Sequence, residues 1–175
     1  MKFTPLSLKG AYLIEIEPVS DERGFFARSF CVREMKGVGL PSDFVQSSYS
    51  FNARKNTLRG MHYQMSPHEE NKIVSCVRGS IFDVIVDMRP TSPTYLKWHG
   101  EILSQDNYKM LFVPKGFAHG FQTMSDNSLV TYNISDFYEP HSARGLKFDD
   151  PKINIKWPQA ELRIISEKDQ NYPLL

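Results

Sequence analysis

Ile81-Phe-Asp-Val-Ile-Val-Asp-Met88 is the stretch of this 175-residue chain that indicates its fold most clearly. Successive side chains of a β-strand point to opposite faces, so the four even-numbered residues, from Phe82 to Met88, would share one apolar face. The opposite face would carry both isoleucines together with Asp83 and Asp87. The pattern therefore predicts a strand with one purely apolar face and one mixed face.

Similar short runs flank this strand in both directions. Lys72–Val77 and Leu129–Ile134 read as further strands, and Gly and Pro residues separate such runs along the whole chain. Many short strands with evenly spaced turns are typical of a sandwich or barrel. Helical periodicity is weak, with one turn near Val32–Lys36 and another near the C-terminus. We therefore predict an all-β, double-sheet jelly-roll (cupin-like) barrel, with residues 1–175 forming a single domain.

Composition excludes several classes of protein. Hydrophobic residues make up 41% and charged residues 23% of the chain, which is ordinary for a globular domain. Lys and Arg number 21 against 20 Asp and Glu, with no basic run, so nucleic acid is not the expected partner. Neither a signal peptide nor a membrane span is recognisable. Cys31 and Cys76 lie in apolar, strand-like contexts and are expected to be free thiols, which favours a cytoplasmic location.

Two stretches carry candidate chemistry. Asn56–Gln64 contains Arg59 and His62, and Val113–Gly120 contains His119 after a Pro-x-Gly turn. Imidazole exchanges protons near neutral pH, so two such stretches in an all-strand chain indicate a small-molecule site inside a barrel. An enzyme is therefore favoured over a scaffold.

Strict alternation, however, would place Arg59 and His62 on opposite faces of their strand. A bulge or kink at Gly60 would bring both onto one face. A ligand reached across a dimer is the alternative.

Other residues admit two interpretations each. Lys72 is either a strand-end lysine reaching solvent or a buried ammonium that needs a partner, such as Asp83 or an anionic ligand. Tyr132 is either a core residue or a general acid. Arg23 is either a solvated loop residue or part of a diphosphate clamp with Arg59.

Asp169 raises the same kind of question. Most carboxylates that follow a periodic segment are surface charges or helix caps. The functional alternative is a carboxylate that orients a base histidine, by the logic of the catalytic triad.

A metal site is a further interpretation of the histidines, because a jelly roll with a Pro-x-Gly-x-x-His turn resembles the cupins. His62, Glu69 or Glu70, and His119 could form a triad of two histidines and a carboxylate. The usual cupin site has a His-x-His pair, and Gln64 stands here where the second histidine would be. Metal binding is therefore not expected.

Taken together, these stretches resemble the dTDP-4-dehydrorhamnose 3,5-epimerase family, a metal-free branch of the cupin fold. The resemblance runs nearly end to end, over Asp21–Phe26, Phe44–Gln46, Leu58–Gln64, Lys72–Val74, Phe82–Arg89, Ser92–Thr94, Val113–Phe121, Tyr132, Tyr138, Asp149–Pro151, Ile155–Pro158 and Ser166–Asp169.

The resemblance implies proton chemistry on a nucleotide-diphospho-4-keto-6-deoxy sugar, without a cofactor. His62 would be the base, held by Asp169, and Tyr132 the acid on the other side of the sugar ring. Lys72 would stabilise the enolate oxygen. Arg23 and Arg59 would hold the diphosphate with His119 and Lys168, and Tyr138 would stack on the nucleobase. The implied substrate-binding set is Arg23, Phe26, Arg28, Gln46, Ser48, Arg59, His119, Tyr138 and Lys168, and the implied assembly is a homodimer.

Three positions depart from the family pattern. Arg28 and Ala143 stand where the family usually has glutamate, and Ser48 where it has asparagine. These positions surround the nucleotide, so a GDP- or CDP-linked sugar is an alternative to the dTDP-sugar. Inversion at C3 alone, a 3,4-ketoisomerase and a non-catalytic sugar-nucleotide-binding cupin also remain open.

Overall fold

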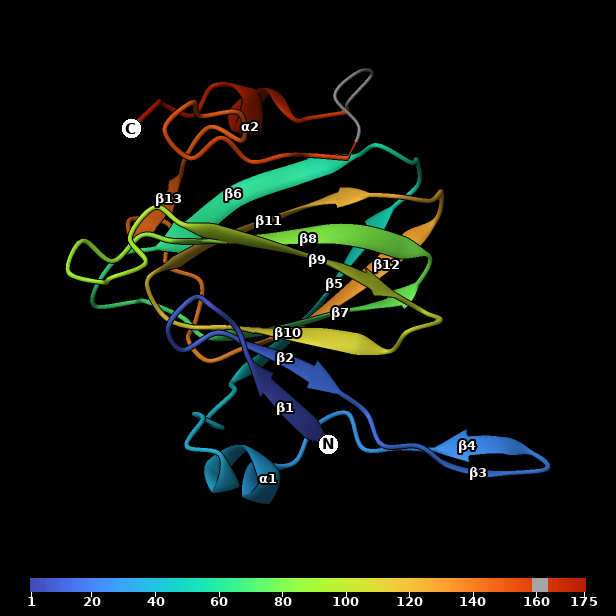
Figure 1. Ribbon diagram of the computed structural model, residues 1–175. Coiled ribbons are helices and arrows are strands. Elements are labelled where there is room, and N and C mark those ends of the chain that lie inside the picture. Colours follow the sequence, from blue (N-terminus) through green and yellow to red (C-terminus); the bar gives the residue numbers. More distant parts are fainter. Residues whose placement is uncertain (159–163) are drawn as a thin grey trace.

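Two antiparallel sheets face each other in the computed structural model, which describes residues 1–158 and 164–175 (Figure 1). The six-stranded sheet has the order β1 (Lys2–Pro5), β2 (Tyr12–Glu15), β10 (Lys109–Val113), β7 (Lys72–Arg78), β12 (Ser128–Ile134) and β5 (Gln46–Asn52). The five-stranded sheet has the order β13 (Ala143–Gly145), β6 (Leu58–Gln64), β11 (Phe117–Thr123), β8 (Ser80–Asp87) and β9 (Trp98–Ser104). The predicted jelly roll is confirmed.

Three apolar clusters stabilise this arrangement. One lies between the sheets and includes Ile81 and Ile85 of β8. A second covers the outer face of the five-stranded sheet, where Val84 packs against the segment that follows β13. The third lies between the six-stranded sheet and α1 (Val32–Gly37), which contributes Met35. The two faces predicted for β8 are therefore confirmed, and its mixed face is the one that points between the sheets.

Strand β6 contains a bulge at Gly60, which was one of the two alternatives for Arg59 and His62. His62 pairs with His119 of β11, whereas Arg59 pairs with Phe121, so β6 holds one more residue than β11 between these two pairs. Gly60 has φ +128°, and an added Cβ would lie 2.5 Å from the Cα of Gly120. A glycine fits this backbone and this close approach. The bulge places Arg59 and His62 on the same face of the strand.

A two-stranded hairpin of β3 (Val19–Asp21) and β4 (Gly24–Phe26) extends away from the sheets (Figure 1). We call residues 19–28 the arm. Its apolar side chains are unusually exposed, with Val19 at 75% and Phe26 at 77%. Exposed apolar side chains on a projecting hairpin indicate a surface that is used for contact.

Both cysteines are free, as expected, but Cys31 is the residue before α1 and not part of a strand. The predicted helical turns are α1 and α2 (Glu167–Gln170). Within the part of the chain that the structure describes, neither helix is long and apolar enough to cross a membrane.

Candidate active site

His62 and Asp169 lie in contact although 107 residues separate them in the chain. His62 Nε2 is 2.8 Å from Asp169 Oδ1, and the other carboxylate oxygen accepts the backbone N–H of Gly60 at 3.1 Å. Ser166 caps α2 by accepting the backbone N–H of Asp169, which fixes the helix that carries the carboxylate. The bulge at Gly60 and the cap of α2 together position the pair.

The hydrogen bond to Asp169 determines which tautomer a neutral His62 adopts. Burial by itself would raise the pKa of Asp169, but hydrogen bonds from His62 and Gly60 outweigh it and hold that pKa below its ordinary value. An ionised Asp169 accepts the proton on Nε2 of His62. Nδ1 of a neutral His62 then carries the free lone pair, which is the arrangement of a general base.

A second histidine–carboxylate pair lies between the sheets. His119 Nε2 is 2.7 Å from Asp83 Oδ1, and both side chains are buried. Burial raises the pKa of Asp83 against the opposing effect of His119. Among the described residues Asp83 Oδ2 has no hydrogen-bond partner. Of the two histidines, His119 is thus the enclosed one and His62 the accessible one.

Tyr132 reaches the same space from the opposite sheet. Its ring meets that of His119 edge to face, with 5.8 Å between the ring centroids. Burial raises the pKa of Tyr132 well above its ordinary value, so the phenol keeps its proton. Ser48 of β5 lies directly across from Tyr132, and Gln46 across from Ile134, so both point to the face that carries Tyr132.

Lys72 is buried, with 8% of its surface exposed, so the interpretation as a lysine reaching solvent is wrong. Its Nζ lies 2.8 Å from Glu70 Oε1, and the other Glu70 oxygen accepts from the Gln64 amide at 3.1 Å. The partner is therefore Glu70 and not Asp83, which is engaged by His119. The loop before β7 brings Glu70 to the lysine, and strand alternation gave no indication of this.

A cavity of about 220 Å³ opens beside these groups. It is lined by His62, Tyr63, Gln64, Glu70, Lys72, Tyr138, Ala143, Arg144, Lys168 and Tyr172. The structure thus brings His62, Lys72, Tyr138 and Lys168, all predicted site residues, to one cavity. Sequence reasoning named Glu70 only as an alternative metal ligand, and it missed Arg144 and Tyr172. The only signal for Tyr172 was its position three residues beyond Asp169.

Arg59 has a hydrogen-bond partner that the sequence did not indicate. Its Nε donates to Asn52 Oδ1 at 2.7 Å, and Asn52 is a buried residue of β5. This contact crosses from the five-stranded sheet to the six-stranded sheet, so it fixes the guanidinium on the face shared with His62.

Several predicted residues do not line this cavity, namely Tyr132, Asp169, Arg59, His119, Gln46 and Ser48, and the arm residues lie apart from it as well. Arg23 is exposed and pairs with Asp21 at 2.6 Å within the hairpin. Arg28 pairs with Glu34 of α1 at 3.0 Å. Phe26 projects into solvent. Within one chain, these three residues are therefore separated from His62.

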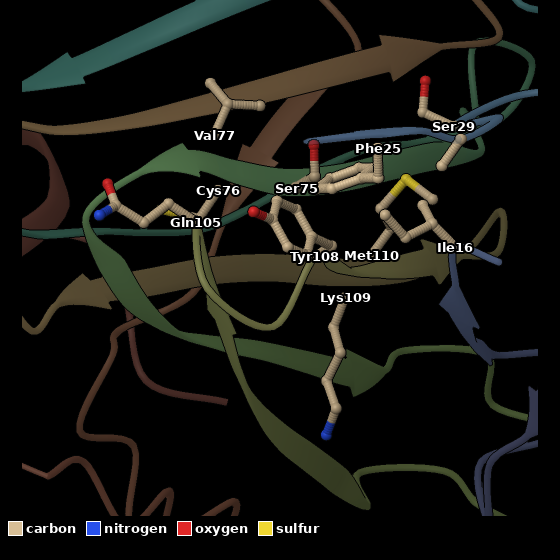
Figure 2. Close-up of a pocket in the computed structure, with 11 residues that line it drawn as sticks. Ile16, Phe25, Ser29, Ser75, Cys76, Val77, Gln105, Tyr108, Lys109 and Met110 are labelled. Atoms are coloured by element: carbon tan, nitrogen blue, oxygen red, sulfur yellow. The ribbon is translucent and has the colours of Figure 1, made fainter. Parts of the chain in front are cut away.

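Figure 2 shows a different cavity, of about 240 Å³, at the base of the arm. Phe25, Tyr108 and Met110 gather around it, and Lys109 points away. Phe25 and Tyr108 meet edge to face at 5.0 Å. None of the predicted site residues lines this cavity, so it forms part of the attachment of the arm.

Glu70, from the alternative metal triad, and Gln64, at the position of the second cupin histidine, both make other contacts. Glu70 pairs with Lys72, and the Gln64 amide also donates to the carbonyl oxygens of His68 and Phe137. Across residues 1–158 and 164–175, no group of three His, Cys, Asp or Glu side chains is placed to hold a metal ion.

The fold and the cavity define a class of protein, namely a jelly-roll isomerase that works by acid–base proton transfer. The sequence model of the dTDP-4-dehydrorhamnose 3,5-epimerases matches residues 5–175, and this chain belongs to that family. A relative of that name from Sinorhizobium fredii is 41% identical over 175 residues, covering 100% of this chain and 90% of the relative. One from Methanothermobacter thermautotrophicus is 43% identical, covering 98% and 92%.

Solved structures of the family superimpose closely. The Bacillus anthracis epimerase with TDP and PPi bound has a TM-score of 0.96 at 38% identity, covering 99% of each chain. The Legionella pneumophila epimerase in complex with dTDP-4-keto-L-rhamnose has a TM-score of 0.93 at 38% identity, covering 99% of this chain and 92% of that one.

Proposed function

We propose that this protein inverts C3 and C5 of dTDP-4-dehydro-6-deoxyglucose and so forms dTDP-4-dehydrorhamnose. The observation that carries the proposal is the hydrogen bond between His62 and Asp169 beside the cavity that Lys72 lines. A ketone at C4 acidifies the protons on its two neighbouring carbons. A base with a free nitrogen and a buried cation nearby is what their removal requires.

The first step takes a proton from the carbon next to the ketone. Nδ1 of His62 accepts it, and the ionised Asp169 stabilises the imidazolium that forms. The electron pair left behind moves to the ketone oxygen and forms an enolate. Lys72, held by Glu70 inside the site, stabilises that oxygen, because a fixed cation in a buried site acts strongly on developing charge.

The second step returns a proton to the opposite face. Tyr132 stands on β12 of one sheet and His62 on β6 of the other, so the two can flank a sugar ring. Its raised pKa keeps the phenol protonated until the enolate carbon, a stronger base, takes the proton. The cycle closes when His62 releases its proton to solvent and the phenolate regains one.

Substrate binding involves the remaining predicted residues. Arg59, Lys168 and His119 bind the diphosphate by charge-assisted hydrogen bonds, and the exposed Tyr138 ring stacks on the base. The arm supplies Arg23 and Phe26 to the cavity of a second copy, because within its own chain neither residue lines the cavity and the arm extends away from the sheets (Figure 1). The protein therefore works as a homodimer.

Thymine is the proposed base, because solved relatives bind TDP and dTDP-4-keto-L-rhamnose. Arg28, Ser48 and Ala143 are the positions that would change this preference. Inversion at C3 alone is the second candidate, favoured by the likeness to a 3'-monoepimerase of Streptomyces bikiniensis, with a TM-score of 0.90 at 28% identity.

Solvent exchange tests the proposal. The protein and its His62→Ala variant are incubated in D₂O with dTDP-4-dehydro-6-deoxyglucose, and deuterium is located by NMR. Label at C3 and C5 that is absent with the variant is the expected result. Label at C3 alone would establish the mono-epimerase. No label at either carbon, with an active family member as control, would contradict the proposal and direct attention to GDP- and CDP-linked sugars.

A further inference from the structure

The tail that follows α2 passes close to His62. Immediately after Tyr172, the Pro173 carbonyl accepts the backbone N–H of Lys147 at 3.3 Å and fixes the course of the tail. Farther on, the backbone N–H of Leu175 donates to the buried carboxylate of Asp150 at 2.7 Å. Tyr172 is therefore held between α2 on one side and these two anchors on the other.

The Tyr172 ring packs directly over Gly145. Gly145 lies directly across the β13–β6 ladder from His62, so a side chain at position 145 would stand beside the imidazole. The Tyr172 ring occupies that place instead, because an added Cβ on Gly145 would lie 2.2 to 2.4 Å from three of its carbons. An aromatic ring laid over a glycine is a recognised way of completing the packing of a sheet edge.

In this position over Gly145, the Tyr172 ring contacts the imidazole of His62. The rings of Tyr172 and His62 meet edge to face, with 5.8 Å between centroids and 67° between planes. Both residues line the same cavity. Asp169 fixes one nitrogen of the imidazole, but a single hydrogen bond leaves the ring free to swing about it. The Tyr172 ring blocks that motion on one side.

We propose that Tyr172 is a positioning residue for His62, acting through its ring and dependent on the absence of a side chain at Gly145. The proposal rests on the proposed function, in which His62 is the base. The phenol hydroxyl takes no part: the contact is made by the ring, and proton donation belongs to Tyr132. Tyr172 thus sets the direction of Nδ1, and with it the reach of the base to the carbon acid.

The kinetic test compares Tyr172→Phe with Tyr172→Ala, with Leu174→Ala as the control because Leu174 is an exposed neighbour in the same tail. Tyr172→Phe keeps the ring and should retain kcat within about twofold, whereas Tyr172→Ala should lower kcat about tenfold or more with KM little changed, since a small misplacement of a catalytic group is costly. Leu174→Ala should behave as wild type. Equal losses in Tyr172→Phe and Tyr172→Ala would overturn the proposal, because they would assign the effect to the hydroxyl.

Gly145→Ala tests the packing of the Tyr172 ring over Gly145. In the wild-type background its methyl group would displace the Tyr172 ring and lower kcat as Tyr172→Ala does. In the Tyr172→Ala background it should have little further effect, since the ring that it displaces is already gone. Additive losses in the double variant would contradict the proposal.

A measurement without substrate separates this proposal from the proposed function. The Nε2 proton of His62, hydrogen-bonded to Asp169, is followed by NMR at a temperature where each variant is folded. It should be sharp in the wild type and Tyr172→Phe and broadened by exchange in Tyr172→Ala at an unchanged Tm. An unchanged signal in Tyr172→Ala would overturn the positioning role, even if the wild type proved to act on a different sugar nucleotide.

Discussion

Asp169 gives His62 its direction and its tautomer, and both depend on the carboxylate being ionised. Asp169→Asn should lower kcat by about 10²- to 10⁴-fold with a small change in KM, because an amide can present its N–H to Nε2 and so reverse the tautomer. The measurement is the rate of solvent deuterium incorporation into the substrate. Asp149→Asn, on an exposed carboxylate, is the control. A tenfold higher KM with kcat intact would speak against this role.

Lys72 and Glu70 form a buried pair whose side chains are 11% and 12% exposed. Lys72→Met leaves the Glu70 carboxylate without its cation, so the free energy of unfolding should fall by about 3 kcal/mol. The same change should lower kcat at least about 100-fold, since it removes the charge that faces the enolate.

Adding Glu70→Gln to Lys72→Met separates these two effects. Urea denaturation should show most of the stability restored, because no unpaired charge remains, while kcat stays low. Recovery of activity together with stability would mean that Lys72 is only a structural residue.

The sequence was informative about these residues to different degrees. Identity and order in the chain pointed to His62, Asp169, Lys72 and Tyr132, because residues of those types at those positions resemble a known set. Partners that come from loops were not predictable. Glu70 reaches Lys72 by the course of the chain before β7, and no periodicity governs a loop.

At the scale of single elements, β8 ends in a polar network around Asp87. Burial by itself would raise its pKa, but hydrogen bonds from Arg89, Ser92 and Thr94 lower it to about 2. The folded pKa lies below the ordinary value of 3.8, so the stabilisation is fully present above about pH 4 and is lost as the pH falls through 2.

Asp87→Asn should therefore lower the free energy of unfolding at pH 7 by about 2 kcal/mol. The difference from the wild type should shrink between pH 4 and pH 2, as measured by urea denaturation across that range. A difference that is constant with pH would show that charge on Asp87 is not the cause.

Element by element, the sequence pattern predicted β7, β8 and β12, each of which has one face between the sheets. It failed where the ladder is irregular. Strict alternation would put Arg59 and His62 on opposite faces, which indicated a bulge or kink at Gly60 as one alternative. It did not indicate that β6 would hold one more residue than β11. A register depends on both strands, and the sequence of one strand cannot supply it.

For the whole molecule, the exchange of arms between copies is testable by complementation. Arg23→Ala and His62→Ala should each be nearly inactive at low substrate concentration. When the two are unfolded and refolded together, half of the dimers contain one chain of each kind. One of the two sites in such a dimer has both Arg23 and His62, so activity should return to about a quarter of the wild-type value.

The alternative gives a different result. If each arm served its own chain, no site in a mixed dimer would be intact and the mixture would stay inactive. Wild-type protein taken through the same refolding is the control. The sequence alone predicts a dimer but not the proposed exchange of arms, because it shows neither the course of the arm nor what the arm contacts.

The distance along the chain between the base and its carboxylate has a consequence for biosynthesis. Asp169 follows His62 by 107 residues, and Tyr172 comes later still. At ordinary rates of translation, a ribosome that has completed β6 needs roughly 5 to 20 s more before Asp169 is made. A chain that stops earlier can contain both sheets and the arm, and still lack the group that orients its histidine. Prematurely terminated products would thus be inactive. In the proposed dimer, such a product could still pair with a full-length chain through its arm.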